Sequence, residues 1–261
     1  MSVVSETNAD LWLSLDRARV YRALAQLFRM PDGESVREAR ERNLPELCGA
    51  LERLAEDSGP AESTDSVEGS DLAGEARALC ELFEDTGVER LRRGHDLAFD
   101  ESSGIRCSPM EMDQLGGPPQ LELTRTFEMA DVGGFYKAFG VEVGDGGERV
   151  DHIVTELEFM NLLAVKESVA LRDEGEGEHA QICRDASRVF LRDHLLRWAP
   201  RLGEKLAEAD GDPIYSAAGR LLGGFIVFDA ARIDAAGAPV HPGHRFTHRV
   251  SHINTPNPPI M

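Results

Sequence analysis

Positive charge is scarce in this sequence, and lysine is almost missing. Of 261 residues only Lys137, Lys166 and Lys205 are lysine, and 47 acidic residues against 28 Lys and Arg give a formal net charge of −19. A field of this sign repels nucleic acids and anionic lipids, and it attracts basic segments. We therefore expect no nucleic-acid partner. The acid excess with so little lysine also leads to the hypothesis of a halophilic host.

Cysteines and long apolar runs are scarce too. The four cysteines, Cys48, Cys80, Cys107 and Cys183, form no C-x-x-C pair, so the usual spacing of zinc and iron–sulfur sites is missing. We expect them to be reduced and packed in or near the core. No apolar run reaches the roughly 18 residues that a membrane helix needs, and Leu11–Leu15 is too short for a signal peptide. These features predict a cytoplasmic protein without stable membrane insertion.

The motifs of common enzyme classes are also missing. The chain has no G-x-x-x-x-G-K-[ST] phosphate loop, no G-x-G-x-x-G after a strand and no G-x-S-x-G nucleophile elbow. Nothing in these patterns indicates a bound nucleotide or an activated serine. We predict a protein that is not an enzyme and that has no cofactor.

What the sequence does contain is a 3.6-residue apolar period. From Leu11 to Phe28, apolar side chains recur every three or four positions, as in an amphipathic helix. Further helices are predicted at Leu47–Ala55, Leu72–Phe83, Val88–Leu91, Leu121–Phe139 (ended by Gly140), Val150–Leu171, Ala186–Trp198 (with Pro200 starting a new segment) and from Pro213 onward. No stretch alternates at period two. We predict an all-α fold, a single globular multi-helix domain over residues 1–230.

Three segments have the composition of irregular chain. Residues 57–71 are rich in Ser, Glu, Asp and Gly and predict a mobile acidic linker, with Asp71 capping the next helix. Residues 102–119, which are rich in Gly and Pro, predict a loop. Residues 235–261 predict a disordered tail rich in His and Pro.

The tail carries histidines at spacings of three, four and four residues, namely His241, His244, His248 and His252. A helix would align these imidazoles, but Pro242 and Gly243 interrupt any helix there. Metal binding would also need a second shell that holds the imidazoles. A disordered polar tail is the favoured interpretation, and a metal-dependent hydrolase that uses these histidines is the alternative.

A cluster of charged residues marks the start of the predicted helix Val150–Leu171. Glu148, Asp151, His152 and Glu156 lie at or just inside this start. In a structural role Glu148 and Asp151 would stabilise the helix N-terminus by roughly 0.3–1 kcal/mol each, and His152 and Glu156 would form an i,i+4 pair. In a functional role the cluster would bind a basic or hydrogen-bonding peptide. Catalysis would need a nucleophile, and none is evident.

Several motifs follow one another in a defined order. The chain reads Y-x-x-L-A-x-L-F at 21–28, C-S-P-M-E at 107–111, E-M-A-D-V-G-G-F-Y-K-A-F-G at 128–140, E-R-V-D-H-I at 148–153, E-L-E-F-M at 156–160 and F-L-x-x-H-L-x-x-W at 190–198. Together these motifs resemble the TorD/DmsD/NarJ family of molybdoenzyme chaperones. More narrowly, they are similar to the chaperones of type II dimethyl sulfoxide reductase-family enzymes.

The resemblance implies an all-helical cytoplasmic chaperone of a molybdopterin oxidoreductase. Family members bind the precursor form of the catalytic subunit, in many cases through its twin-arginine leader, and hold it for cofactor insertion and assembly. The family's E-x-x-D-H motif is implicated in leader binding and matches Glu148, Asp151 and His152. Arg149 stands where many members have proline. The chaperone would be a monomer or a homodimer without a metal, and a structural subunit of the reductase is the alternative.

A leader combines a basic head with an apolar middle, so a receptor for it needs an apolar groove and an acidic rim. We predict that Glu148 and Asp151 face the arginines of the leader. The aromatic side chains predicted to contact its apolar stretch are Phe135, Tyr136 and Phe139, for which core packing is the alternative. Pro109 and Glu111 are candidates for a further wall of the site.

Overall fold

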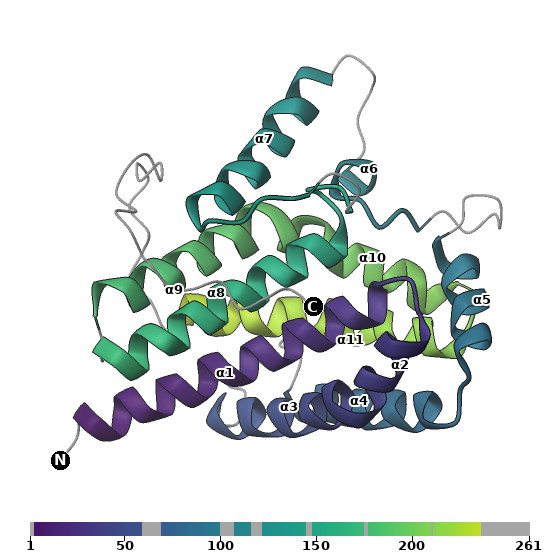
Figure 1. Cartoon of the computed structure of the whole chain (residues 1–261), viewed down its shortest axis with the longest axis horizontal. Helices are drawn as coiled ribbons and strands as arrows, with labels where there is room; N and C mark the ends of the chain where they lie inside the picture. The colour runs from purple at the N-terminus through teal and green to yellow at the C-terminus, as the bar shows by residue number, and fades with distance from the viewer. Residues whose placement is uncertain are drawn as a thin grey trace.

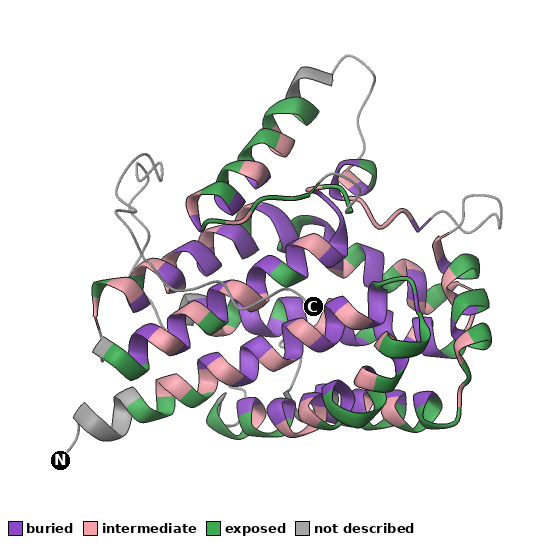
Figure 2. Ribbon diagram, in the orientation of Figure 1, coloured by how far each residue is buried: buried purple, intermediate pink, exposed green. Residues whose placement is uncertain are grey.

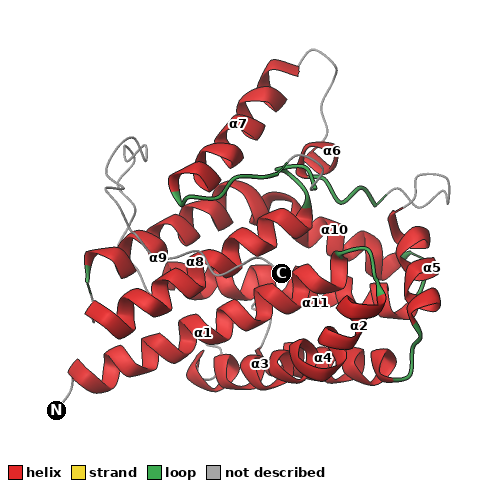
Figure 3. Cartoon of the chain, viewed as in Figure 1, coloured by secondary structure: helices red, strands yellow, loops and turns green. Residues whose placement is uncertain are grey.

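A computed structural model describes residues 3–58, 69–99, 107–115, 122–144, 148–174, 177–209 and 211–235. These residues are helical almost throughout (Figure 3), and the described part of the chain contains no strand. Its one isolated β-bridge pairs Met110 with His152. The predicted all-α fold is therefore confirmed.

The helices follow one another from the N-terminus to the C-terminus. They are α1 (Val3–Phe28), α2 (Gly33–Glu38), the π-helical turn η1 (Ala39–Asn43), α3 (Leu44–Ser58), α4 (Gly69–Glu84), α5 (Val88–Phe99), α6 (Glu111–Leu115), α7 (Glu122–Ala138), α8 (Ile153–Glu174), α9 (Glu178–Phe190), the π-helical turn η4 (Leu191–Leu195), α10 (Leu196–Glu208) and α11 (Pro213–Ala235).

The helix α11 runs through the middle of the bundle. It contacts α1, α4, α5, α9 and α10, while α8 lies between α1 and α9 (Figure 1). Leu221, Leu222, Phe225 and Ile226 of α11 are fully buried, and burying each such side chain contributes about 1.5–3 kcal/mol. Residues 213–233 are also long and apolar enough to cross a membrane, but 67% of that window is buried inside the bundle.

Glycines let α10 and α11 approach closely. A Cβ atom added at Gly219 would lie 2.7 Å from the backbone oxygen of Gly203, and one added at Gly223 would lie 3.3 Å from that of Pro200. Real Cβ atoms do not tolerate the shorter of these distances. Glycine at 219 is therefore required by the packing of the two helices.

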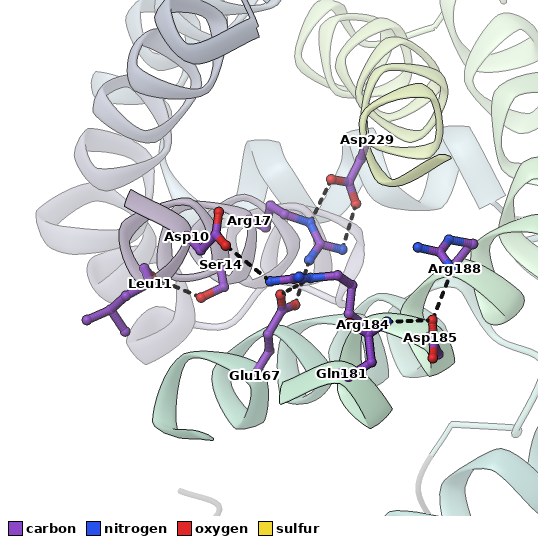
Figure 4. A network of polar contacts seen from close by, with 10 residues as sticks. All are labelled: Asp10, Leu11, Ser14, Arg17, Glu167, Gln181, Arg184, Asp185, Arg188 and Asp229. Atoms are coloured by element: carbon purple, nitrogen blue, oxygen red, sulfur yellow. Dashed lines mark hydrogen bonds and ion pairs between the residues drawn. The ribbon is translucent and has the colours of Figure 1, made fainter. Parts of the chain in front are cut away.

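A buried group of charged residues, here called the Arg17 cluster, joins four helices (Figure 4). Arg17 of α1 donates to Asp229 of α11 at 2.7 and 3.1 Å and to Glu167 of α8 at 3.2 Å. Arg184 of α9 donates to the other oxygen of Glu167 at 2.9 Å, and the hydroxyl of Tyr21 donates to Asp229 at 2.5 Å. Although burial lowers the pKa of Arg17, Asp229 and Glu167 raise it above its ordinary value. The guanidinium groups thus compensate both buried carboxylates.

Several predicted helix starts are wrong, and the predicted helix Ala186–Trp198 is in fact the end of α9, the turn η4 and the start of α10. The helix α1 begins at Val3 and not at Leu11, and α8 begins at Ile153 and not at Val150. Pro200 does not start a new segment, because it lies inside α10. The π-helical turn η4 comes directly before α10, and such a locally widened helix accommodates the missing N–H and the bulky ring of a nearby proline.

The predicted irregular segments are shorter than expected. The helix α3 continues to Ser58 and α4 begins at Gly69, so Asp71 lies inside α4 and does not cap it. The short helix α6 lies within the predicted loop 102–119, and α2 and η1 were not predicted. Residues 59–68 of the predicted linker lie outside the described residues. So do residues 236–261, which include the four tail histidines and any metal site on them.

Candidate functional site

The segment before α6 and the segment before α8 lie side by side, although about 40 residues separate them in sequence. The N–H of Glu111 donates to the carbonyl of Asp151 at 2.8 Å, and the N–H of Ile153 donates to the carbonyl of Pro109 at 2.8 Å. These two hydrogen bonds flank the bridge between Met110 and His152. The structure therefore brings together the C-S-P-M-E and E-R-V-D-H-I motifs. This pairing also explains why residues 150–152 are not helical.

Asp151 is fully buried, and its carboxylate is already occupied. The side chain of Arg149 donates to both carboxylate oxygens at 2.9 Å, and the N–H of Met112 donates to one of them at 3.3 Å. The Arg149 side chain is itself 46% exposed. Asp151 thus holds a guanidinium group in the two-point geometry that carboxylates prefer, and it also supports the backbone of α6.

His152 is buried beside the exposed side chain of Glu148. Its Nδ1 accepts the N–H of Val154 at 3.2 Å, close to the start of α8, and its Nε2 lies 3.6 Å from Glu148 Oε2. The bond to Val154 assigns the ring proton of the neutral form to Nε2. Burial lowers the pKa of His152, although Glu148 acts in the opposite direction. The imidazole is therefore neutral at neutral pH, and Glu148 presents its carboxylate to solvent.

The three predicted aromatic residues are all buried. Phe135 and Phe139 pack edge-on against Phe159 at ring distances of 6.3 and 5.9 Å, and Tyr136 lies 4.8 Å from the same ring. The hydroxyl of Tyr136 donates to the carbonyl of Val150 at 2.8 Å. These side chains hold the C-terminal end of α7 against α8 and tie it to the loop that follows.

A second group of buried residues lies next to Asp151. Glu111 and His194 are both fully buried, with His194 Nδ1 3.3 Å from each carboxylate oxygen of Glu111. The indole N–H of Trp198 donates to Glu156 Oε2 at 3.2 Å. Burial raises the pKa of Glu156 well above its ordinary value, and the negative charges of Glu111 and Asp151 add to this effect. We call Glu111, Asp151, Glu156 and His194 the acidic cluster.

Sequence reasoning recognised His194 and Trp198 only as parts of a motif and did not place them in the site. Glu156 was included in the charged group at the start of the helix, but its burial was not predicted. The signal that could have found all three is that they belong to the ordered motifs. In the structure His194 contacts Glu111 of the C-S-P-M-E motif, and Trp198 contacts Glu156 of the E-L-E-F-M motif.

Some of these residues have the donor types of a metal site. Ligand atoms of Glu111, Glu128 and His194 lie within 4.8 Å of one another. However, Arg197 donates to Glu128 at 3.0 Å and already compensates its charge. His194 Nε2 lies 3.3 Å from Asp131 Oδ2, without the alignment of a hydrogen bond. Glu128 therefore already has a cationic partner, and a metal ion at this position would have to displace Arg197.

Phe127, in the outer half of α7, is the most exposed large apolar side chain among the described residues. The helix projects away from the bundle in Figure 1, and most of its outer residues are exposed or intermediate (Figure 2). Phe127 is 73% exposed, which is unusual for a large aromatic side chain. Sequence reasoning did not select Phe127, because a single aromatic residue in a helix carries no sign of its exposure.

Comparison with known proteins gives consistent relatives. A family model described as the nitrate reductase delta subunit matches residues 68–204. The chlorate reductase assembly chaperone protein of Ideonella dechloratans is 29% identical over 215 residues, which are 82% of this chain and 87% of that protein. The chaperone protein TorD of Vibrio cholerae is 26% identical over 251 residues, 90% of this chain and 95% of that protein.

A shorter and more similar match is to the selenate reductase assembly chaperone protein of Thauera selenatis, 36% identical over 100 residues, which are 38% of this chain and 49% of that protein. The family model covers more than half of this chain, including both segments that meet at the acidic cluster. The chain therefore belongs to the nitrate reductase delta subunit family, the TorD and NarJ group of molybdoenzyme maturation chaperones.

Proposed function

We propose that this maturation chaperone binds the precursor form of the catalytic subunit of a molybdopterin oxidoreductase in the cytoplasm, with the twin-arginine leader seated at the loop between α7 and α8. Its relatives are assembly chaperones, named for chlorate reductase and selenate reductase in two cases, and not enzymes. The partner is accordingly a molybdoenzyme reductase. What we propose beyond this is that the chain binds the precursor form, that it binds the leader, and that the leader binds at the loop between α7 and α8.

The observation that carries the proposal is the contact between Arg149 and Asp151. The loop already holds one guanidinium group at both oxygens of a buried carboxylate, at 2.9 Å each. A leader arginine has the same chemistry and would exchange with Arg149, while the exposed carboxylate of Glu148 receives the second arginine. The formal net charge of −19 attracts a basic leader to this surface from a distance.

The apolar stretch of the leader needs a different surface. The predicted aromatic residues are buried and would not contact the leader directly. We propose that they hold α7 in position, namely Phe135, Tyr136 and Phe139. The exposed Phe127 stands 12 residues before Phe139 in the sequence, about 18 Å along a helix. We propose that the apolar stretch lies along the outer half of α7 as far as Phe127, with Pro109 and Glu111 supporting the loop.

Binding of a fluorescent leader peptide to the full chain, followed by anisotropy, tests this assignment. Glu148→Ala and Phe127→Ser should each raise Kd by roughly 5- to 10-fold, since each removes an exposed contact worth about 1–1.4 kcal/mol. Glu84→Ala on α4 is the matched control for a lost surface charge and should leave Kd unchanged. Both site residues are exposed, so these variants test binding more cleanly than Asp151→Ala with His152→Ala, which would also remove buried hydrogen bonds.

A peptide with two lysines in place of the arginines separates charge from geometry. Lysine cannot reproduce the two-point contact with a carboxylate, so its peptide should bind several-fold more weakly at equal net charge. Equal affinity of the two peptides, together with an unchanged Kd for Glu148→Ala, would show that the leader does not bind at this loop.

The client itself is identified by mass spectrometry of the proteins that co-purify with the tagged chain from its own host. Capture of a molybdopterin oxidoreductase subunit with its leader intact supports the proposal. Presence of the chain in the purified, finished enzyme would instead favour a structural subunit.

A further inference from the structure

Two cysteines that are 32 residues apart in sequence meet at the contact between α3 and α4. The Sγ atoms of Cys48 and Cys80 lie 3.2 Å apart. Both residues are free thiols and partly exposed, whereas Cys107 and Cys183 are buried. The predicted position in or near the core is confirmed for Cys48, Cys80, Cys107 and Cys183, but the spacing in the sequence did not predict that two of them meet.

The helix faces explain why the pair forms at the edge of the contact. Leu47 and Leu79 are fully buried in the core between the helices. Each cysteine follows one of these leucines directly, and one residue turns a helix by about 100°. The two thiols therefore lie beside the apolar contact, and both residues are partly exposed.

The surroundings make the two thiols unequal. The S–H group of Cys80 stabilises the thiolate of Cys48, and Arg77 adds to this effect, so the pKa of Cys48 falls below its usual range although burial and Glu52 oppose the shift. The contact with Cys48, followed by burial, raises the pKa of Cys80. Cys48 is thus the better nucleophile, because the thiolate is the reactive form of a cysteine.

We propose that Cys48 and Cys80 form a redox-active dithiol that a low-molecular-weight disulfide, such as oxidised glutathione, converts into an intrachain disulfide. The Cys48 thiolate attacks one sulfur of glutathione disulfide and releases the first glutathione thiolate. Cys80, after losing its proton, attacks Cys48 Sγ and releases the second. The protein loses two electrons and two protons, and one glutathione disulfide is reduced to two glutathione molecules.

The geometry requires little movement. A disulfide bond is about 2.05 Å long, so the two sulfur atoms must approach by roughly 1 Å from their present 3.2 Å. The bond would join α3 to α4 and close the chain segment between them, which restricts the unfolded state. The pair lies on the side of the bundle away from α7 (Figure 1), so this inference is independent of the leader site.

Thiol counting on the wild-type full chain tests the inference. After incubation with oxidised glutathione and removal of the reagent, the denatured chain should show two free thiols in place of four. Peptide mapping should find Cys48 linked to Cys80, and the melting temperature should rise by roughly 5–10 °C. Dithiothreitol should reverse all three changes.

Single substitutions provide the controls. Cys48→Ser should abolish both the cross-link and the rise in melting temperature, and Cys107→Ala should leave them intact. Four remaining thiols in the wild type, glutathione retained on Cys48, or a link only between separate chains would each overturn the inference. Because the mapping uses the wild-type chain, poor folding of a variant does not affect that result.

Discussion

The Arg17 cluster and the acidic cluster are both buried, but they differ in how their charges are balanced. In the Arg17 cluster, Arg17 and Arg184 form ion pairs with the carboxylates of Asp229 and Glu167. In the acidic cluster, Glu111, Asp151 and Glu156 are all fully buried. The guanidinium group that contacts Asp151 comes from the half-exposed Arg149, and among the described residues no group donates to Glu156 Oε1.

The difference indicates a division of roles within the bundle. Buried carboxylates with matched guanidinium groups fix the positions of α1, α8, α9 and α11, because breaking such a pair leaves an uncompensated charge. Buried carboxylates without matched cations must be protonated or must recruit a cation. The carboxylates of the acidic cluster therefore have fewer cationic partners than those of the Arg17 cluster, whose ion pairs join α1, α8, α9 and α11.

The largest effect is expected from breaking the compensated cluster. Arg17→Met leaves the carboxylates of Asp229 and Glu167 buried with fewer partners and should lower the free energy of unfolding by about 3–5 kcal/mol. Urea unfolding measures this loss. Arg42→Ala, which removes an exposed i,i+4 ion pair with Glu38, is the control and should cost less than about 1 kcal/mol. Similar costs for the two variants would contradict the distinction.

Glu156 tests the uncompensated cluster through pH. Its pKa is raised in the folded state, so the folded chain binds the proton more tightly than the unfolded chain. This contribution to stability is complete below the unfolded pKa near 4.5 and is lost as the pH rises through the folded pKa. Glu156→Gln keeps an acceptor for Trp198 and removes the titration. The variant should therefore be more stable than the wild type at neutral pH, with the difference shrinking toward pH 4.

The comparison is made on unfolding curves of the two proteins at each pH, so that other titrating groups cancel. A stability difference that does not change with pH would show that folding leaves the pKa of Glu156 unshifted.

Arg149 is the cation that the acidic cluster has recruited from its own loop. Arg149→Ala frees the Asp151 carboxylate and should strengthen binding of the leader peptide by roughly 3- to 10-fold, or about 0.7–1.4 kcal/mol, while lowering the free energy of unfolding because Asp151 is fully buried. Fluorescence anisotropy and urea unfolding measure the two effects. Arg125→Ala, which removes an exposed partner of Asp113, is the control. Weaker leader binding by Arg149→Ala would mean that Arg149 supports the site and does not compete for it.

The smallest effect is expected from salt on the compensated cluster. Raising NaCl from 0.1 to 1 M shortens the Debye length from about 10 to 3 Å, which relieves repulsion on a chain of net charge −19 and should increase its stability. The cost of Arg17→Met should change by less than about 0.5 kcal/mol, because buried pairs are screened little. A wild type whose stability does not rise with salt would count against the halophile hypothesis.

The presence of most long helices and the family could be predicted from the sequence alone. The apolar period at Leu11–Phe28 reports which face of a helix is buried, and this information is local to each segment. Gly140 ends α7 with a φ of 77°, as its position after the predicted helix indicated. The ordered motifs then identified the group of chaperones to which the chain belongs. These signals need only neighbouring residues.

Features that depend on contacts between residues far apart in the sequence could not be predicted from it. The start of α8 at Ile153 depends on hydrogen bonds to residues 109–111, and the burial of Glu156 depends on Trp198 and Glu111. The meeting of Cys48 with Cys80 depends on how α3 packs against α4. The local apolar period of a helix specifies which of its residues face the core. It does not specify which other helix packs against that face. The chemistry of the acidic cluster and of the thiol pair exists only once the helices have packed.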